Sequence, residues 1–210
     1  MVFDLDGTLL DTWTVHRHSL RQAAVTVGLV APSAATLATV QRATDLDTLR
    51  ALVGDERLDR ADSAYGAALR AALSTRSVPA MPGAAEAVAR LRAADIAVGV
   101  CTGRSRRDAQ RLLDASDLLI DLTVAREEAH RPKPAPDGLL RALELLDLTA
   151  DTALYVGDSA ADVAQGRDAG VRTLLLARPS RVPGLRASAD GPPHLASLCD
   201  LPDLVRRDST

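Results

Sequence analysis

The hydrophobic pattern of the chain changes near residue 80. Between Thr12 and about Val78 apolar residues recur with the spacing of α-helices, and nothing there resembles a strand. Gly28, Pro32 and Gly54 divide this region into shorter segments. We therefore predict a small bundle of four helices.

The remainder of the chain shows short apolar runs that alternate with helical stretches. The predicted strands are residues 1–3, 96–101, 121–125, 153–156 and 171–176, and the predicted helices are 84–94, 105–115, 137–146, 160–169 and about 201–206. Residues 178–193 are rich in Pro, Gly, Ser and Arg and are expected to be irregular. This alternation predicts an α/β fold, a doubly wound parallel sheet of the Rossmann-like kind with the four-helix cap inserted. A Pro/Gly cluster at 78–83 is the expected hinge.

Polar side chains follow the predicted strands at the points where they end. Asp4 and Asp6 follow the first strand, a Thr102-Gly103-Arg104 segment follows the second, and Gly157-Asp158 follows a later one. Lys133 lies in the loop before the helix that begins near residue 137. Ligands of such sheets bind outside the carboxyl ends of the strands, so these groups are expected to meet.

The chemistry of this predicted cluster favours a hard cation and a phosphate. It contains the carboxylates of Asp4, Asp6, Asp158 and Asp162 with no His or Cys, which selects an oxygen-binding metal and favours Mg²⁺ over Ca²⁺. Lys133, the Thr102 hydroxyl and the loop amides could hold anionic oxygens. We therefore expect Mg²⁺ as cofactor and a small phosphorylated metabolite as partner.

Composition narrows the function classes further. Of 25 basic residues, 24 are arginine and only Lys133 is lysine, which suggests a site that needs a compact ammonium. The net charge is -3 and aromatic residues make up 2% of the chain, so no basic field or base-stacking surface for nucleic acid is expected. Cys101 and Cys199 are interpreted as small buried hydrophobic residues. No leader-like or membrane-spanning stretch is apparent, and we expect a cytoplasmic protein, a monomer or possibly a homodimer, without membrane partners.

Four segments together resemble the motifs of the haloacid dehalogenase-like hydrolases. They are Asp4-Leu5-Asp6-Gly7-Thr8-Leu9, Thr102-Gly103, Arg131-Pro132-Lys133-Pro134, and Gly157-Asp158 followed by Asp162. The match is closest to the phosphoglycolate phosphatase-like branch, in which a helical cap follows the first motif. The resemblance implies a core of residues 1–11 and 81–210 and a helical cap of residues 12–80.

The resemblance also implies a role for each matching residue. Asp4 would attack phosphorus to form an aspartyl-phosphate, and Asp6 would protonate the leaving oxygen and later activate water. Thr102 and Gly103 would bind phosphoryl oxygens, and Lys133 would offset negative charge. Asp4, Asp158 and the Asp6 carbonyl would hold Mg²⁺, supported by Asp162 from outside the ligand set. The implied function is a Mg²⁺-dependent phosphatase that hydrolyses a small phosphomonoester.

Two other functions remain open. A β-phosphoglucomutase-like sugar-phosphate mutase is suggested by the Asp11-Thr12-x-x-x-His16 segment, although the cap region contains no lysine. A catalytically silent module that binds a phosphorylated ligand is the alternative outside enzymes. His16 and Arg104 are candidate substrate contacts, but a solvated or lightly packed His16 and a solvated Arg104 are the favoured interpretations.

Overall fold

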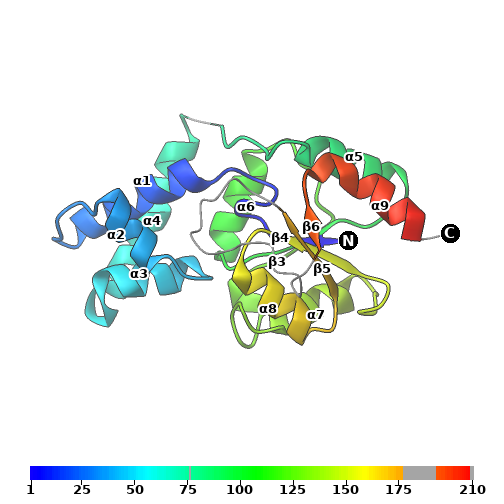
Figure 1. Cartoon of the computed structure of the whole chain (residues 1–210). Coiled ribbons are helices and arrows are strands. Elements are labelled where there is room, and N and C mark those ends of the chain that lie inside the picture. Colours follow the sequence, from blue (N-terminus) through cyan, green and yellow to red (C-terminus); the bar gives the residue numbers. More distant parts are fainter. Residues whose placement is uncertain (76, 177–192, 209–210) are drawn as a thin grey trace.

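The computed structural model describes residues 1–75, 77–176 and 193–208. Within these residues six strands form one parallel sheet in the order β3-β2-β1-β4-β5-β6 (Figure 1). The strands are β1 (Val2–Phe3), β2 (Gly99–Cys101), β3 (Leu122–Val124), β4 (Leu154–Gly157), β5 (Arg172–Leu176) and β6 (His194–Leu195). The strand order reverses direction at β1, which confirms the predicted doubly wound sheet.

Strand β1 lies at the centre of the sheet although it contains two residues. Val2 pairs with Gly99 of β2 and Tyr155 of β4, and Phe3 pairs with the next residue of each neighbour. The two side chains point to opposite faces, since Val2 packs in one buried cluster and Phe3 in the other. The strand is thereby held from both edges and both faces, and the chain leaves it at Asp4.

Two helical layers cover the sheet. Helices α5 (Ala84–Ala93), α6 (Arg106–Asp114) and α9 (Leu201–Asp208) share the buried cluster that contains Phe3. Helix α7 (Asp137–Leu145) lies on the other face with Val2, and α8 (Ala160–Asp168) packs against β4 and β5 beside it (Figure 1). Short 3₁₀ turns η2 (Arg126–Glu128) and η3 (Leu198–Asp200) precede α7 and α9.

The inserted cap lies to one side of the sheet, at the left of Figure 1. It comprises α1 (Trp13–Thr26), α2 (Ala34–Val40), α3 (Asp45–Val53), the 3₁₀ turn η1 (Asp55–Arg57) and α4 (Leu58–Leu73), so the predicted four-helix cap is confirmed. Its main internal contact runs between α1 and α4. Burial of the apolar face of each helix explains why these short helices are stable together.

The chain crosses between cap and sheet twice, and the two crossings lie side by side. Leu10 and Ala80 form an antiparallel bridge, and the amide of Asp11 donates to the carbonyl of Pro79 at 2.9 Å. The amide of Met81 donates in turn to the carbonyl of Leu9 at 2.8 Å. The domain limits predicted at residues 12 and 80 fall within this paired segment and stay a prediction.

Some sequence predictions need correction. The strand predicted at 96–101 begins only at Gly99, and β6 was not among the predicted strands. Cys101 is buried as expected, but Cys199 is only half-buried. The segment predicted as irregular, 178–193, lies outside the described residues except for Pro193. Among the residues described, the helices are too short or too polar to cross a lipid bilayer.

Candidate active site

Four connections bring the predicted polar residues to the carboxyl edge of the sheet. Asp4 follows β1, Thr102 follows β2, Lys133 lies between β3 and α7, and Asp158 follows β4. Asp4, Thr102 and Lys133 are buried, and Asp158 is half-buried. The groups therefore converge where the strand order reverses, as the parallel topology requires.

Lys133 lies between two carboxylates. Its Nζ donates to Asp4 Oδ1 at 2.7 Å and also contacts Asp162 Oδ1. Burial opposes the charged ammonium, but the two carboxylates outweigh it and raise the pKa of Lys133 well above its usual value. Burial raises the pKa of Asp4 despite Lys133, whereas for Asp162 the neighbouring Lys133 outweighs burial and lowers the pKa.

Asp162 is fixed by several donors. Its Oδ1 accepts from the Tyr155 hydroxyl at 2.7 Å, and its Oδ2 accepts from the amides of Asp158 at 3.2 Å and Ser159 at 2.9 Å. The Ser159 hydroxyl caps α8 through the amide of Asp162. A Cβ at Gly157 would lie 2.3 Å from the Cβ of Asp162, so this close approach requires glycine. With both oxygens occupied, Asp162 is suited to orient Lys133 and the 158–159 loop.

The carboxylates also form a set that fits a divalent cation. Asp4, Asp158 and Asp162 each present a ligand oxygen, and these oxygens lie within 4.8 Å of one another. Three carboxylates face one ammonium, and all the donors are the hard oxygens that Mg²⁺ prefers. Since Asp162 already accepts several hydrogen bonds, Asp4 and Asp158 are the better candidates for direct ligation. The Asp6 side chain does not belong to this set; the prediction for it concerned its main-chain carbonyl.

Asp6 instead forms an ion pair with Arg104, in which the Arg104 side chain is buried and the Asp6 side chain is half-buried. The guanidinium Nε lies 2.8 Å from Oδ1 and 2.7 Å from Oδ2, and its Nη2 lies 2.6 Å from Oδ1. The Thr12 hydroxyl also donates to Oδ1. Burial opposes the ionised carboxylate, but Arg104 and Thr12 more than compensate and lower the pKa of Asp6. Only 3% of Arg104 is exposed, so the favoured expectation of a solvated Arg104 is wrong.

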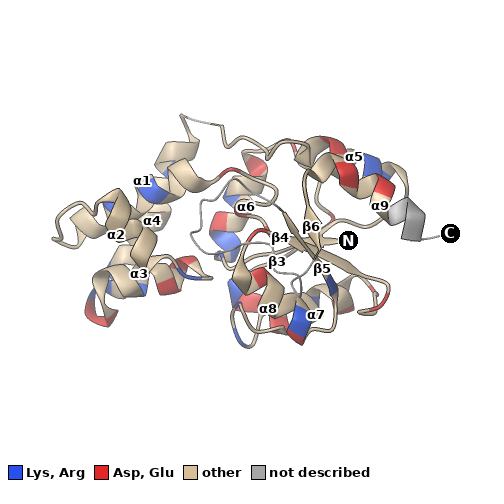
Figure 2. Ribbon diagram, in the orientation of Figure 1, with Lys and Arg blue, Asp and Glu red and all other residues tan. Residues whose placement is uncertain are grey.

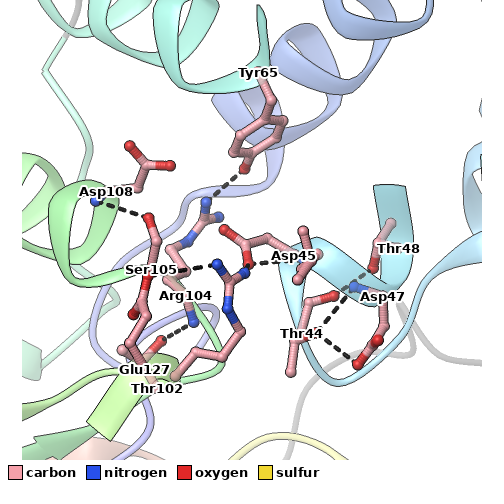
Figure 3. Close-up of polar contacts among 12 residues, drawn as sticks. Thr44, Asp45, Asp47, Thr48, Tyr65, Thr102, Arg104, Ser105, Asp108 and Glu127 are labelled. Atoms are coloured by element: carbon pink, nitrogen blue, oxygen red, sulfur yellow. Dashed lines mark hydrogen bonds and ion pairs between the residues drawn. The ribbon is translucent and has the colours of Figure 1, made fainter. Parts of the chain in front are cut away.

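Two cap residues extend this pair. Arg104 Nη1 donates to the hydroxyl of Tyr65 at 2.5 Å (Figure 3), and that hydroxyl lies 2.7 Å from His16 Nδ1. His16 is buried, not solvated, which corrects the expectation for it. Burial and the nearby Arg104 lower its pKa to about 4, so His16 is neutral near pH 7.

The cap rests directly on the loop after β2. A Cβ at Gly103 would lie 2.2 Å from the carbonyl oxygen of Ala43, so the cap backbone touches this loop without a side chain between them. Beside that contact, the buried carboxylate of Asp45 pairs with Arg126 of the core (Figure 3). Thr102 is turned toward its own loop, where its hydroxyl accepts from the Arg104 amide at 3.2 Å.

An open cavity of about 480 Å³ leads to Lys133 between the cap and the core. Its lining includes Arg42 and Arg50 from the cap and Pro134 from the core. Arg50 is paired with Asp47 and Asp55. Lys133 is thus the residue of the buried cluster that lines this cavity, whereas the carboxylates of Asp4, Asp158 and Asp162 do not line it.

The predicted site residues therefore fall into two groups. Asp4, Lys133, Asp158 and Asp162 lie together, and Asp6 and Arg104 lie together beside them with His16 at the far end. Sequence reasoning missed Tyr65, Asp45 and Arg126. Tyr65 is one of only two tyrosines, which was the available signal, whereas nothing distinguished Asp45 and Arg126 among 28 acidic and 25 basic residues. Along the described ribbon acidic and basic positions are interspersed in both parts of the molecule (Figure 2).

Comparison with known proteins gives concordant results. A sequence model described as "Haloacid dehalogenase-like hydrolase" matches residues 1–176. A phosphoglycolate phosphatase from Rhodospirillum rubrum is 32% identical over 84% of this chain and 78% of its own length. A putative pyrophosphatase PpaX from Caldanaerobacter subterraneus is 41% identical, but the match covers 42% of this chain and 41% of that protein. The crystal structure of CbbY from Rhodobacter sphaeroides with phosphate matches at a TM-score of 0.83 and 20% identity over 95% of this chain and 94% of that one.

Proposed function

Since the chain belongs to the haloacid dehalogenase-like hydrolases and is an enzyme of the phosphatase type, we propose that it hydrolyses a small phosphomonoester with Mg²⁺ through an aspartyl-phosphate on Asp4. The observation that carries the proposal is the buried Asp4 carboxylate, which lies beside Asp158 and is held at 2.7 Å by Lys133, a residue that lines the cavity between cap and core. The names of the relatives support the class of substrate, a phosphate ester or a related phosphate anhydride.

In the first step Asp4 supplies the nucleophile. The Asp4 oxygen that is not bonded to Lys133 attacks phosphorus, and the bond to the leaving oxygen breaks. Because Arg104 lowers the pKa of Asp6, its carboxyl is mostly ionised near pH 7, and its minor protonated form donates the proton to the leaving oxygen. Lys133 offsets charge on Asp4 and on the phosphoryl oxygens, while Asp162 keeps the ammonium in place. The Gly103 amide and the Thr102 hydroxyl are the proposed donors to the phosphoryl group.

In the second step water releases phosphate from Asp4. Asp6, now a carboxylate, takes a proton from water, and the water oxygen attacks phosphorus to regenerate Asp4. Asp4, Asp158 and the Asp6 carbonyl would hold Mg²⁺, which offsets charge on the transferring phosphoryl group when bound. The cap, seated on Gly103, excludes bulk water from the reacting atoms.

The proposal is tested by phosphate release from a panel of small phosphomonoesters, in Mg²⁺ or in EDTA. The panel contains phosphoglycolate, sugar phosphates, alkyl phosphates, nucleoside monophosphates and p-nitrophenyl phosphate. We expect release that requires Mg²⁺ and falls at least ~10³-fold in Asp4→Asn, because the amide cannot form the covalent intermediate. Release that is unaffected by this substitution, or none from any ester, would contradict the proposal.

A further inference from the structure

A chain of polar groups, buried from Arg104 onward, joins the half-buried Asp6 to two helices of the cap. It runs from the Asp6 carboxylate through the Arg104 guanidinium to the hydroxyl of Tyr65 on α4 and then to His16 on α1. Tyr65 is fully buried and Arg104 is 3% exposed, so water does not replace these contacts. The chain ends at His16, whose buried Nε2 makes no hydrogen bond with the described residues.

Each hydrogen bond of this chain has a defined donor: Arg104 donates to Asp6 on one side and to Tyr65 on the other, and Tyr65 donates to His16. Arg104 is always a donor, so the Tyr65 oxygen accepts from Nη1. The Tyr65 hydroxyl then has its proton free to donate to His16 Nδ1, which accepts in the neutral ring. Tyr65 therefore fixes the position of Nη1 from the cap, and the rigid guanidinium carries that constraint to Nε and Nη2.

The constraint makes the two oxygens of Asp6 unequal. Oδ1 accepts from Arg104 Nε and Nη2 and from Thr12. Among the described residues Oδ2 accepts only from Arg104 Nε, at 2.7 Å. Oδ2 therefore keeps a lone pair for proton exchange, and the guanidinium determines where that oxygen lies.

We propose that Tyr65 is a positioning residue of the reaction, which acts through Arg104 to place Asp6 Oδ2 for proton transfer with the leaving group. This inference rests on the proposed phosphatase function and adds to it a link from the cap to the proton-transfer step. Tyr65 does not touch the reacting atoms.

The leaving group provides the test. An alkyl phosphate releases a strongly basic alkoxide that needs a proton, whereas p-nitrophenyl phosphate releases a stable phenolate that needs none. The value of kcat/KM covers the steps up to departure of the leaving group. We expect Tyr65→Phe, which removes only the hydroxyl, to lower kcat/KM at least ~10-fold for the alkyl phosphate that the panel ranks first and less than ~2-fold for p-nitrophenyl phosphate.

Three further variants make the test decisive. Asp6→Asn removes the proton donor, so it gives the largest selective loss of kcat/KM for the alkyl ester that a failure of proton transfer can cause. Arg104→Lys keeps the positive charge but loses the planar guanidinium with its several N–H donors. It should show the same selectivity between the two esters as Tyr65→Phe, and it provides the test if Tyr65→Phe folds poorly. Leu69→Ala lies one turn further along α4 and is buried without a polar group, so it should lower kcat/KM for both esters alike.

The outcomes separate the two proposals. Equal losses for both esters in Tyr65→Phe and Arg104→Lys, or a gain for the alkyl ester, overturn the positioning role while the phosphatase function stands. If wild type hydrolyses neither ester, the phosphatase function fails and the inference falls with it.

Discussion

Two ionic networks lie near each other in this molecule, and they are built differently. The first joins Lys133 to Asp4 and Asp162, and all its members come from the connections of the parallel sheet. The second joins Asp6 and Arg104 of the core to Tyr65 of the cap, and the adjacent Asp45–Arg126 pair also connects cap with core.

The two networks therefore depend on the cap to different extents. The Lys133 network is complete within the core, so the proposed nucleophile Asp4 and its counter-charge are organised without the cap. The Arg104 network is complete only when the cap is seated on the Gly103 loop. Closing the cap therefore organises the proposed proton-transfer group, while the proposed nucleophile and Lys133 are organised beforehand.

Removing the ammonium of Lys133 should have the largest effect. Lys133→Met leaves Asp4 and Asp162 buried without a counter-charge, which should reduce stability by about 3–5 kcal/mol near pH 7.5. Phosphate release should fall by at least ~10³-fold, since the negative charge on the phosphoryl group is then unopposed. Denaturant unfolding and steady-state kinetics measure the two losses.

A matched control lies two residues away. Arg131 also pairs with an aspartate, Asp137, but its side chain is 67% exposed. Arg131→Met should therefore leave both stability and turnover close to wild type. If Lys133→Met were as stable and as active as this control, the core network would not have the role assigned to it.

The contrast between the networks also explains what the sequence could predict. Asp4, Lys133, Asp158 and Asp162 follow strands of a parallel sheet, and topology alone brings the ends of such strands together. The alternation of apolar runs and helical stretches predicts that topology, so the core and this half of the site were accessible from the pattern.

The contacts between cap and core could not be predicted from the sequence in the same way. Its four helices follow from periodicity, but their docking depends on which side chains meet across more than 30 residues of sequence, as Tyr65 and Arg104 do. Arg104 is one of 24 arginines, and only its three-dimensional surroundings distinguish it from a surface charge. The two-residue strand β6 was missed because it depends on pairing with β5.

The pH dependence of stability should report the cap interface through Asp45. Burial, only partly offset by Arg126, raises the pKa of Asp45 from 3.8 to about 6 in the folded protein. Between these pH values the folded state binds this proton more tightly than the unfolded state. The contribution of Asp45 to stability therefore falls as the pH rises through that window and is constant above it.

Asp45→Asn removes this titration and leaves the other groups in place. The difference in unfolding free energy, variant minus wild type, should rise by about 2–3 kcal/mol between pH 4 and pH 7. Denaturant titrations at several pH values measure it, and common effects of other groups cancel in the difference. A difference that stays flat with pH would show that Asp45 is not held in a desolvated contact with the core.

A substitution at Gly103, where the core touches the cap, disturbs the Arg104 network and leaves the Lys133 network in place, with a smaller loss of stability than Lys133→Met. A Cβ at Gly103 would lie 2.2 Å from the Ala43 carbonyl oxygen and 3.1 Å from Thr44 Cα, so Gly103→Ala must push the cap away. We expect kcat/KM to fall about tenfold, equivalent to about 1.4 kcal/mol, mainly through KM, while the Lys133 network stays intact. Amide hydrogen exchange should quicken in α2 and α3 but not in the strands.

Gly170→Ala is the opposite control, because Gly170 has φ +70° with open space around it and lies at the C-terminal end of α8. That variant should lose stability through backbone strain and keep its turnover. Equal exchange in the Gly103→Ala cap and the wild-type cap would mean that the cap does not depend on this contact to close, and the division between the two networks would have to rest on Tyr65 and Asp45 alone.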